Sequence, residues 1–252
     1  MTLEIVALLV NVIISIIVPL IALGVVIRKY KEQWKGIVAI FLCGGLVYVA
    51  MQWGAKEHGL TWLFNNTSFM ELMESNYILY LFLVALAGAL LTAFGQIFIG
   101  VVPFRKKITM GKAISFSLGY SMVEAIWLVG LRNINTLTEA FGGTELTLNT
   151  SVIELFLSGY ERVLFLIIEM AIVLVLMYFI QHGKILRGLL IALLCYTLLS
   201  FLPGFFIAFS LPEYLEVFSR STALIMVYIV LTASALASVV IMKVCNNLSY
   251  EY

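Results

Sequence analysis

Long apolar runs separated by short polar segments make up most of the chain. Seven runs approach or exceed the roughly 20 residues that a helix needs to cross a bilayer. None alternates with the period of two expected of a barrel strand, and helices satisfy their own backbone in lipid. We therefore predict an all-α fold, a polytopic membrane helix bundle of about seven spans that forms a single integral membrane domain over residues 1–252. The predicted spans cover residues 3–27, 36–53, 77–102, 111–131, 152–181, 188–210 and 221–242.

The distribution of charge predicts how the spans are oriented. Most of the 15 Lys and Arg residues follow the first, third, fifth and seventh spans, and many glutamates lie in the opposite loops. Because cytoplasmic loops carry an excess of Lys and Arg, we expect the N-terminus outside and the C-terminus in the cytoplasm. Among the outer segments, residues 54–76 mix aromatic and polar residues and predict an interfacial helix. Residues 132–151 are expected to form a polar loop.

The composition supports a membrane protein and limits the kinds of partner and metal site that the chain could have. The chain is 63% hydrophobic and 12% charged, with a mean hydropathy of +1.08, whereas soluble domains are about 45–50% apolar and about 25% charged. A net charge of +1 gives no basic surface for nucleic acid, so the expected partner is the lipid bilayer. All acidic residues are glutamate, and the spacing of Cys43, Cys195 and Cys245 fits no metal site.

The fifth predicted span carries the densest charge of any span. Glu161, Arg162 and Glu169 interrupt a run that is otherwise apolar, and each charge costs about 3 kcal/mol in hydrocarbon, so partners are required. Polar residues in the third, fourth and sixth spans recur at helical spacing and are expected to face them. In the fourth span this spacing places Ser117, Tyr120, Ser121 and Glu124 on one helical face. The candidate catalytic residues are Glu124, Glu161 and Glu169, and the candidate binding residues are Gln96, Tyr120, Glu124, Glu161, Arg162, Glu169, Tyr196 and Ser200.

The residue types available to this polar centre limit what it can catalyse. The two histidines, His58 and His182, lie away from the middle of every span, so no Ser–His pair and no histidine zinc ligands are expected there. A positive Arg162 would repel a cation held by the glutamates. We therefore predict no metal and no cofactor, and we expect Arg162 to pair with Glu124 or, through a bend in the helix, with Glu161. A purely structural network and a functional centre remain as alternatives.

Four motifs in order resemble the YhfC family of intramembrane metalloproteases, which is distantly similar to the CAAX-protease and bacteriocin-processing group. Gly119 to Glu124 stands where the family has Gly-His-Gly-Gly-x-Glu, with Tyr120 in the histidine position. Glu161-Arg162 matches a Glu-Arg pair, and Glu169 occupies the position of a following histidine. Residues 91–96, with Gln96, replace a paired-glutamate and arginine signature. Tyr196 and Ser200 replace a His-x-x-x-Asp pair.

The resemblance implies a degenerate member that keeps the scaffold and lacks the histidines and the glutamate pair. On this basis we expect a pseudoenzyme in the bacterial cytoplasmic membrane that binds a membrane protein, peptide or lipidic partner in an immunity, regulatory or assembly role. One alternative is an active intramembrane peptidase with an atypical glutamate site, the only case in which zinc would be expected. Another is a transporter or permease-like subunit, although the chain has no internal repeat.

Overall fold

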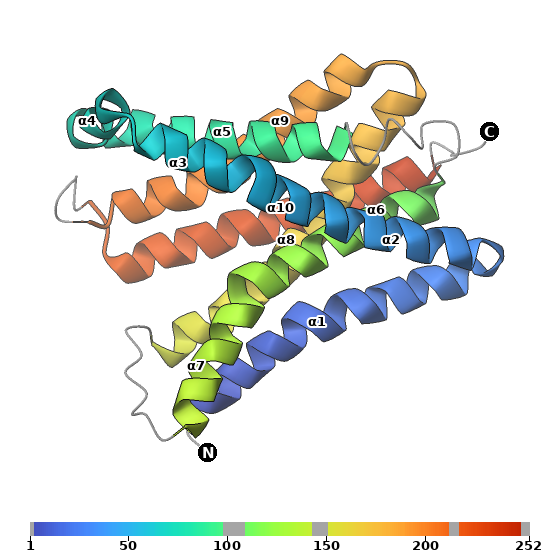
Figure 1. The fold of residues 1–252 in the computed structure, drawn as a ribbon, viewed down its shortest axis with the longest axis horizontal. Coiled ribbons are helices and arrows are strands. Elements are labelled where there is room, and N and C mark those ends of the chain that lie inside the picture. The colour runs from blue at the N-terminus through green and yellow to red at the C-terminus, as the bar shows by residue number, and fades with distance from the viewer. Residues whose placement is uncertain (1–2, 98–108, 143–150, 212–216, 248–252) are drawn as a thin grey trace. The chain divides into compact units, whose positions relative to one another are not determined.

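A computed structural model of the protein describes residues 3–97, 109–142, 151–211 and 217–247, and this part of the chain is helical without strands. Short π-helical segments, η2 (Ala50–Glu57) and η5 (Ile126–Gly130), continue α2 and α6, and a 3₁₀ turn, η1 (Lys31–Gln33), precedes α2. The α-helices are α1 (Leu3–Lys29), α2 (Trp34–Val49), α3 (His58–Phe64), α4 (Thr67–Ser75), α5 (Tyr77–Gly95), α6 (Met110–Ala125), α7 (Leu131–Phe141), α8 (Val152–Gln181), α9 (Ile185–Ala208) and α10 (Arg220–Asn247) (Figure 1).

Seven helical segments are long and apolar enough to cross a membrane, as the sequence predicted. Their lengths run from 19 to 32 residues, against the roughly 20 residues that span a hydrocarbon core. The all-α polytopic fold is therefore confirmed, and the chain is a multi-pass membrane protein. Its orientation across the membrane stays a prediction.

Local signals in the sequence set both ends of α8. Ser151 and Glu154 form a capping box: the Ser151 N–H donates to Glu154 Oε2 (3.1 Å), and the Glu154 N–H donates to Ser151 Oγ (3.2 Å). At the other end Gly183 adopts a φ of 73°, and the Lys184 N–H donates to the Phe179 carbonyl (2.8 Å). Glycine takes this left-handed conformation at little cost, so α8 ends there.

The helices pack into two units, each described here by itself. The first comprises residues 1–46 and 109–170, and the second residues 47–108 and 171–252. Helix α8 is continuous and contributes its first part to one unit and its last part to the other. The expected single integral membrane domain stays a prediction.

In the first unit α1 packs along α6, η5 and α7 (Figure 1). One apolar cluster joins Ala7 and Leu8 of α1 to Leu137 of α7 and Leu155 of α8. A second cluster joins α1, α2, α6 and α8 through Leu23, Val26, Ile37, Leu118 and Leu166. These clusters place α6 and α8 side by side around the polar residues described below.

Helices α2 and α6 approach closely enough for backbone atoms to meet, in addition to the side-chain contacts of the second cluster. A methyl group on Gly44 would overlap the Phe116 carbonyl oxygen, and one on Gly119 would overlap the Phe41 carbonyl oxygen. The contact is thus reciprocal, with each helix placing a glycine against a carbonyl of the other. Small residues permit such close approach of helices in membranes.

The second unit is built on a long contact between α5 and α9, with α10 against α9 and α4 against α5 (Figure 1). The Phe82 and Phe201 rings meet edge to face, with centroids 5.7 Å apart. Asn76 caps α5 by accepting a hydrogen bond from the Leu79 N–H (3.1 Å). These contacts give α5 and α9 a defined register.

The outer segments are more helical than the sequence predicted. The expectation of a polar loop over 132–151 is wrong for residues 132–141, because α7 extends through Phe141, while 143–150 lie outside the described residues. Leu137 is buried against α1, and the hydroxyls of Thr136 and Thr138 donate to carbonyls four residues back. Residues 54–76 hold α3 and α4, so their helical character is confirmed, and their place at the membrane surface stays a prediction.

Candidate functional site

A buried carboxyl cluster joins α6 to α8 in the first unit. Glu169 of α8 is only 4% exposed, and the Ser121 hydroxyl of α6 donates a hydrogen bond to its Oε2. The Glu124 side chain, one turn beyond Ser121 on α6, lies near enough to interact electrostatically with Glu169. The helical spacing that grouped Ser121 and Glu124 therefore describes a real face, directed at Glu169.

The contact with Ser121 gives the Glu169 carboxyl a hydrogen-bond donor. Burial of a polar group costs free energy unless the group is hydrogen-bonded, so this donor helps to hold Glu169 within the apolar span. The segment that follows Glu124 is η5, and π-helical turns are frequent at functional sites.

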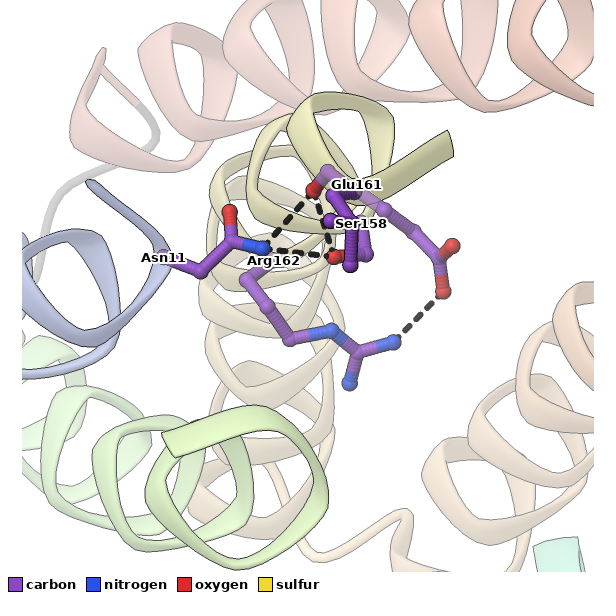
Figure 2. A network of polar contacts seen from close by, with 5 residues as sticks. Asn11, Ser158, Glu161 and Arg162 are labelled. Atoms are coloured by element: carbon purple, nitrogen blue, oxygen red, sulfur yellow. Dashed lines mark hydrogen bonds and ion pairs between the residues drawn. The ribbon is translucent and has the colours of Figure 1, made fainter. Parts of the chain in front are cut away.

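A separate ion pair lies near the start of α8. Arg162 Nη2 is 2.5 Å from Glu161 Oε1, so the predicted pairing of Arg162 with a carboxylate is confirmed with Glu161 as partner (Figure 2). Helix α8 is continuous across both residues, and their long side chains meet alongside it, while the expected bend stays a prediction. The guanidinium carbon also lies 5.0 Å from the Phe165 ring centroid.

This ion pair is incompletely buried and incompletely satisfied. The Arg162 side chain is 13% exposed and that of Glu161 is 29% exposed. Arg162 Nε is buried and forms no hydrogen bond within the described chain. The pair thus keeps one unused donor and one accessible carboxylate.

Asn11 anchors α1 to the same stretch of α8, a role that the sequence analysis missed. Its Nδ2 donates to the Leu155 carbonyl (2.7 Å) and to Ser158 Oγ (3.0 Å), as Figure 2 shows. The Asn11 side chain also lies so close to Gly159 that a Cβ there would overlap it. The available signal was a single amide in the apolar run of α1, because polar side chains within spans usually hydrogen-bond across helices.

The other candidate binding residues lie outside these two groups of charged side chains. Gln96 and Tyr196, both buried in the second unit, bond to each other: Gln96 Nε2 donates to the Tyr196 hydroxyl (2.7 Å), which lies 3.0 Å from Gln96 Oε1. Tyr120 is buried on α6, and Ser200 is exposed on α9. The structure thus groups the candidates as Glu124 with Glu169, Glu161 with Arg162, and Gln96 with Tyr196.

Metal-binding residue types do not gather in the part of the chain that the structure describes. No three His, Cys, Asp or Glu side chains there could hold one ion. His58 and His182 are exposed, Cys43 and Cys195 are half-buried free thiols, and Cys245 is a buried one. The residues that could act on a ligand are therefore the glutamates, Arg162 and the hydroxyls around them.

The contrast between Ser121 and Ser117 provides a first test of the carboxyl cluster. Both serines are buried on α6 one turn apart, but the hydroxyl of Ser117 has no hydrogen-bond partner among the described residues. Ser121→Ala should lower the free energy of unfolding by about 1–2 kcal/mol, since Glu169 loses a buried donor. Ser117→Ala should be neutral or slightly stabilising. Unfolding in mixed detergent–SDS micelles measures both, and equal effects would contradict the Ser121–Glu169 bond.

Comparison of the chain with family models, curated proteins and solved structures found no match. Its function is therefore inferred from the side chains of the site. Two arrangements carry that inference: the neighbouring carboxyls on α6 and α8, and the part-exposed ion pair on α8.

Proposed function

We propose that the protein is a non-hydrolytic binding protein on a YhfC-type scaffold in the bacterial cytoplasmic membrane, and that it holds a membrane protein, peptide or lipidic partner at the Glu161–Arg162 pair. The observation that carries this proposal is the accessible ion pair within an apolar span. A charge in a membrane span is costly and usually marks a pathway or a binding site. A purely structural pair would be expected to use all its donors, whereas Arg162 keeps Nε unused.

The chemistry of the pair indicates the groups a partner would present. The guanidinium of Arg162, whose side chain is 13% exposed, would donate to a hydroxyl, an amide carbonyl or a carboxylate in an otherwise apolar partner. The Glu161 carboxylate, 29% exposed, would accept from a hydroxyl, an amide or an amine. The Phe165 ring beneath the guanidinium adds an apolar contact. Immunity, regulatory and assembly roles all require recognition of this kind.

The absence of hydrolysis in this proposal rests on how the polar groups are engaged. Ser121 donates to Glu169 and not to a histidine, so the serine–histidine pair of many hydrolases is not formed at this residue. Arg162 already neutralises Glu161. In the resemblance, these positions correspond to the family motifs whose histidines are replaced here.

Photo-crosslinking in native membranes tests the proposal. A benzophenone amino acid at Phe165, which touches Arg162, should give a discrete adduct with one partner. Arg162→Gln should reduce the adduct by about tenfold or more, because the charge-assisted contact is lost. The matched control is Arg132→Gln, which removes an exposed charge from α7 and should leave the adduct unchanged. Adducts identical to those formed from the exposed Leu194 of α9 would contradict binding at this site.

A second function is favoured by the proximity of Glu124 to Glu169. Two neighbouring carboxyls can act as a general base and a general acid, as in aspartic proteases. This is the peptidase alternative with an atypical glutamate site. Cells carrying Glu124→Gln should then accumulate uncut membrane peptides in quantitative proteomics. Peptide profiles identical to those of wild-type cells would count against it.

A further inference from the structure

A cluster of basic residues lies where α1 ends and α2 begins, in the first unit. Arg28 and Lys29 close α1, and Lys31 and Lys35 follow across the turn, and all four are exposed. Lys112, in the first turn of α6, completes the cluster. We refer to these five residues as the basic turn: Arg28, Lys29, Lys31, Lys35 and Lys112.

Three contacts hold the two segments of the basic turn together. The Thr109 hydroxyl donates to Gln33 Oε1 (2.7 Å). The Tyr30 ring packs against Gly111, where a Cβ would lie only 2.7 Å from Cδ2 of the ring. A Cβ on Gly36 would lie 3.1 Å from Cε of Lys112, so this lysine stem runs along the start of α2. The start of α6 therefore adds its charge to a site formed by a distant segment of the chain.

Aromatic side chains set the level of the basic turn in the membrane. Trp34 is 51% exposed, and Lys35 Nζ lies 5.7 Å from its ring centroid. Lys29 Nζ lies 5.4 Å from the centroid of Tyr30. Exposed Trp and Tyr at the end of a span sit at the level of lipid headgroups. The lysine ammonium groups beside these rings are thus placed at the level of lipid phosphates.

We propose that the basic turn binds anionic phospholipid headgroups. Only one acidic residue, the exposed Glu32, lies within residues 28–35. Clusters of four to eight Lys and Arg residues directly beside a span bind anionic lipid, with a gain of about fivefold in affinity per basic residue. A role in orienting the spans would require only an excess of positive charge. Such a role would not account for the packing of Lys112 against α2 or for the aromatic rings beside Lys29 and Lys35.

Fluorescence quenching by brominated lipid tests the proposal on the full-length chain. Replacing Trp53, Trp62 and Trp127 with phenylalanine leaves Trp34 as the reporter beside Lys35. In mixed vesicles, brominated phosphatidylglycerol should quench Trp34 severalfold more than the same mole fraction of brominated phosphatidylcholine. High salt should remove the difference, because the interaction is electrostatic. Equal quenching by the two lipids would overturn the proposal.

Charge-removal variants separate this site from general charge effects. Lys31→Gln with Lys35→Gln should remove most of the preference for phosphatidylglycerol, because about fivefold in affinity is lost with each basic residue. The matched control is Lys184→Gln with Arg187→Gln, which removes two exposed charges, one directly before α9 and one in its first turn, and should preserve the preference. An equal loss in both double variants would overturn the assignment. If the tryptophan replacements prevent folding, native mass spectrometry of the unaltered chain with both lipids gives the same comparison, and equal retention overturns the proposal.

Discussion

Gly119→Ala should lower the free energy of unfolding by about 2–3 kcal/mol. The added methyl would overlap the Phe41 carbonyl oxygen, which belongs to the α2 backbone and cannot move aside as a side-chain end can. Overpacking of a close contact costs typically about 1–3 kcal/mol, and a backbone obstacle places this site near the upper end. Unfolding in mixed detergent–SDS micelles provides the measurement.

Gly24→Ala is the matched control for this substitution. Gly24 lies on α1 with no atom within 4 Å of a Cβ built there, so the same methyl meets open space. Alanine is favoured over glycine within a helix by about 0.5–1 kcal/mol, so Gly24→Ala should be neutral or stabilising. Gly44→Ala should behave like Gly119→Ala, because it meets the Phe116 carbonyl oxygen. Equal unfolding of the Gly119 and Gly24 variants would contradict the backbone contact.

Glu169→Leu is expected to have the second-largest effect, a loss of about 1–3 kcal/mol. Leucine fills part of the space but leaves the Ser121 hydroxyl without its buried partner. Glu169→Gln keeps groups that can donate and accept, so it should cost less than about 1 kcal/mol. The same unfolding titration measures both variants. The difference between their free energies of unfolding gives the effect of losing the hydrogen bond, separately from the effect of changing the side-chain size.

A double-mutant cycle tests whether the stability lost in Glu169→Leu comes from the hydrogen bond with Ser121. In the Ser121→Ala background, Glu169→Leu should cost less by about 0.6 kcal/mol and at most about 1.7 kcal/mol, the range found for hydrogen bonds between membrane helices. Additive effects would show that the two residues act independently, against the observed bond.

The long apolar runs were enough to predict the spanning helices, because bilayer thickness and backbone hydrogen bonding leave few alternatives. The extension of the fourth span into α7 was missed, since the threonines of that segment suggested a loop. In the structure their hydroxyls donate to the preceding turn, and Leu137 gives the helix a buried face. The polar residues of this segment alone could not show that apolar residues of α1 would pack against it.

The polar centre was predicted in part, for a similar physical reason. Spacing placed Ser117, Ser121 and Glu124 on one face of a helix, but the rotation of α6 against α8 decides which serine meets Glu169. The partners of Asn11 likewise depend on the distance between two helices. Such distances are set by small residues such as Gly159, whose importance appears only once the neighbouring helix is known.

The reciprocal glycine contact between α2 and α6 has a consequence for how the protein assembles. Main-chain atoms have no rotamers to lose, so joining these helices freezes no side-chain freedom at the point of contact. The Cα hydrogens of glycine can also donate weakly to the facing carbonyls, which adds attraction without a side chain. Contacts between bulky side chains must first be ordered, whereas this one needs only two inserted helices to approach. We therefore expect α2 and α6 to associate early and to act as the template on which α1 and α8 then pack.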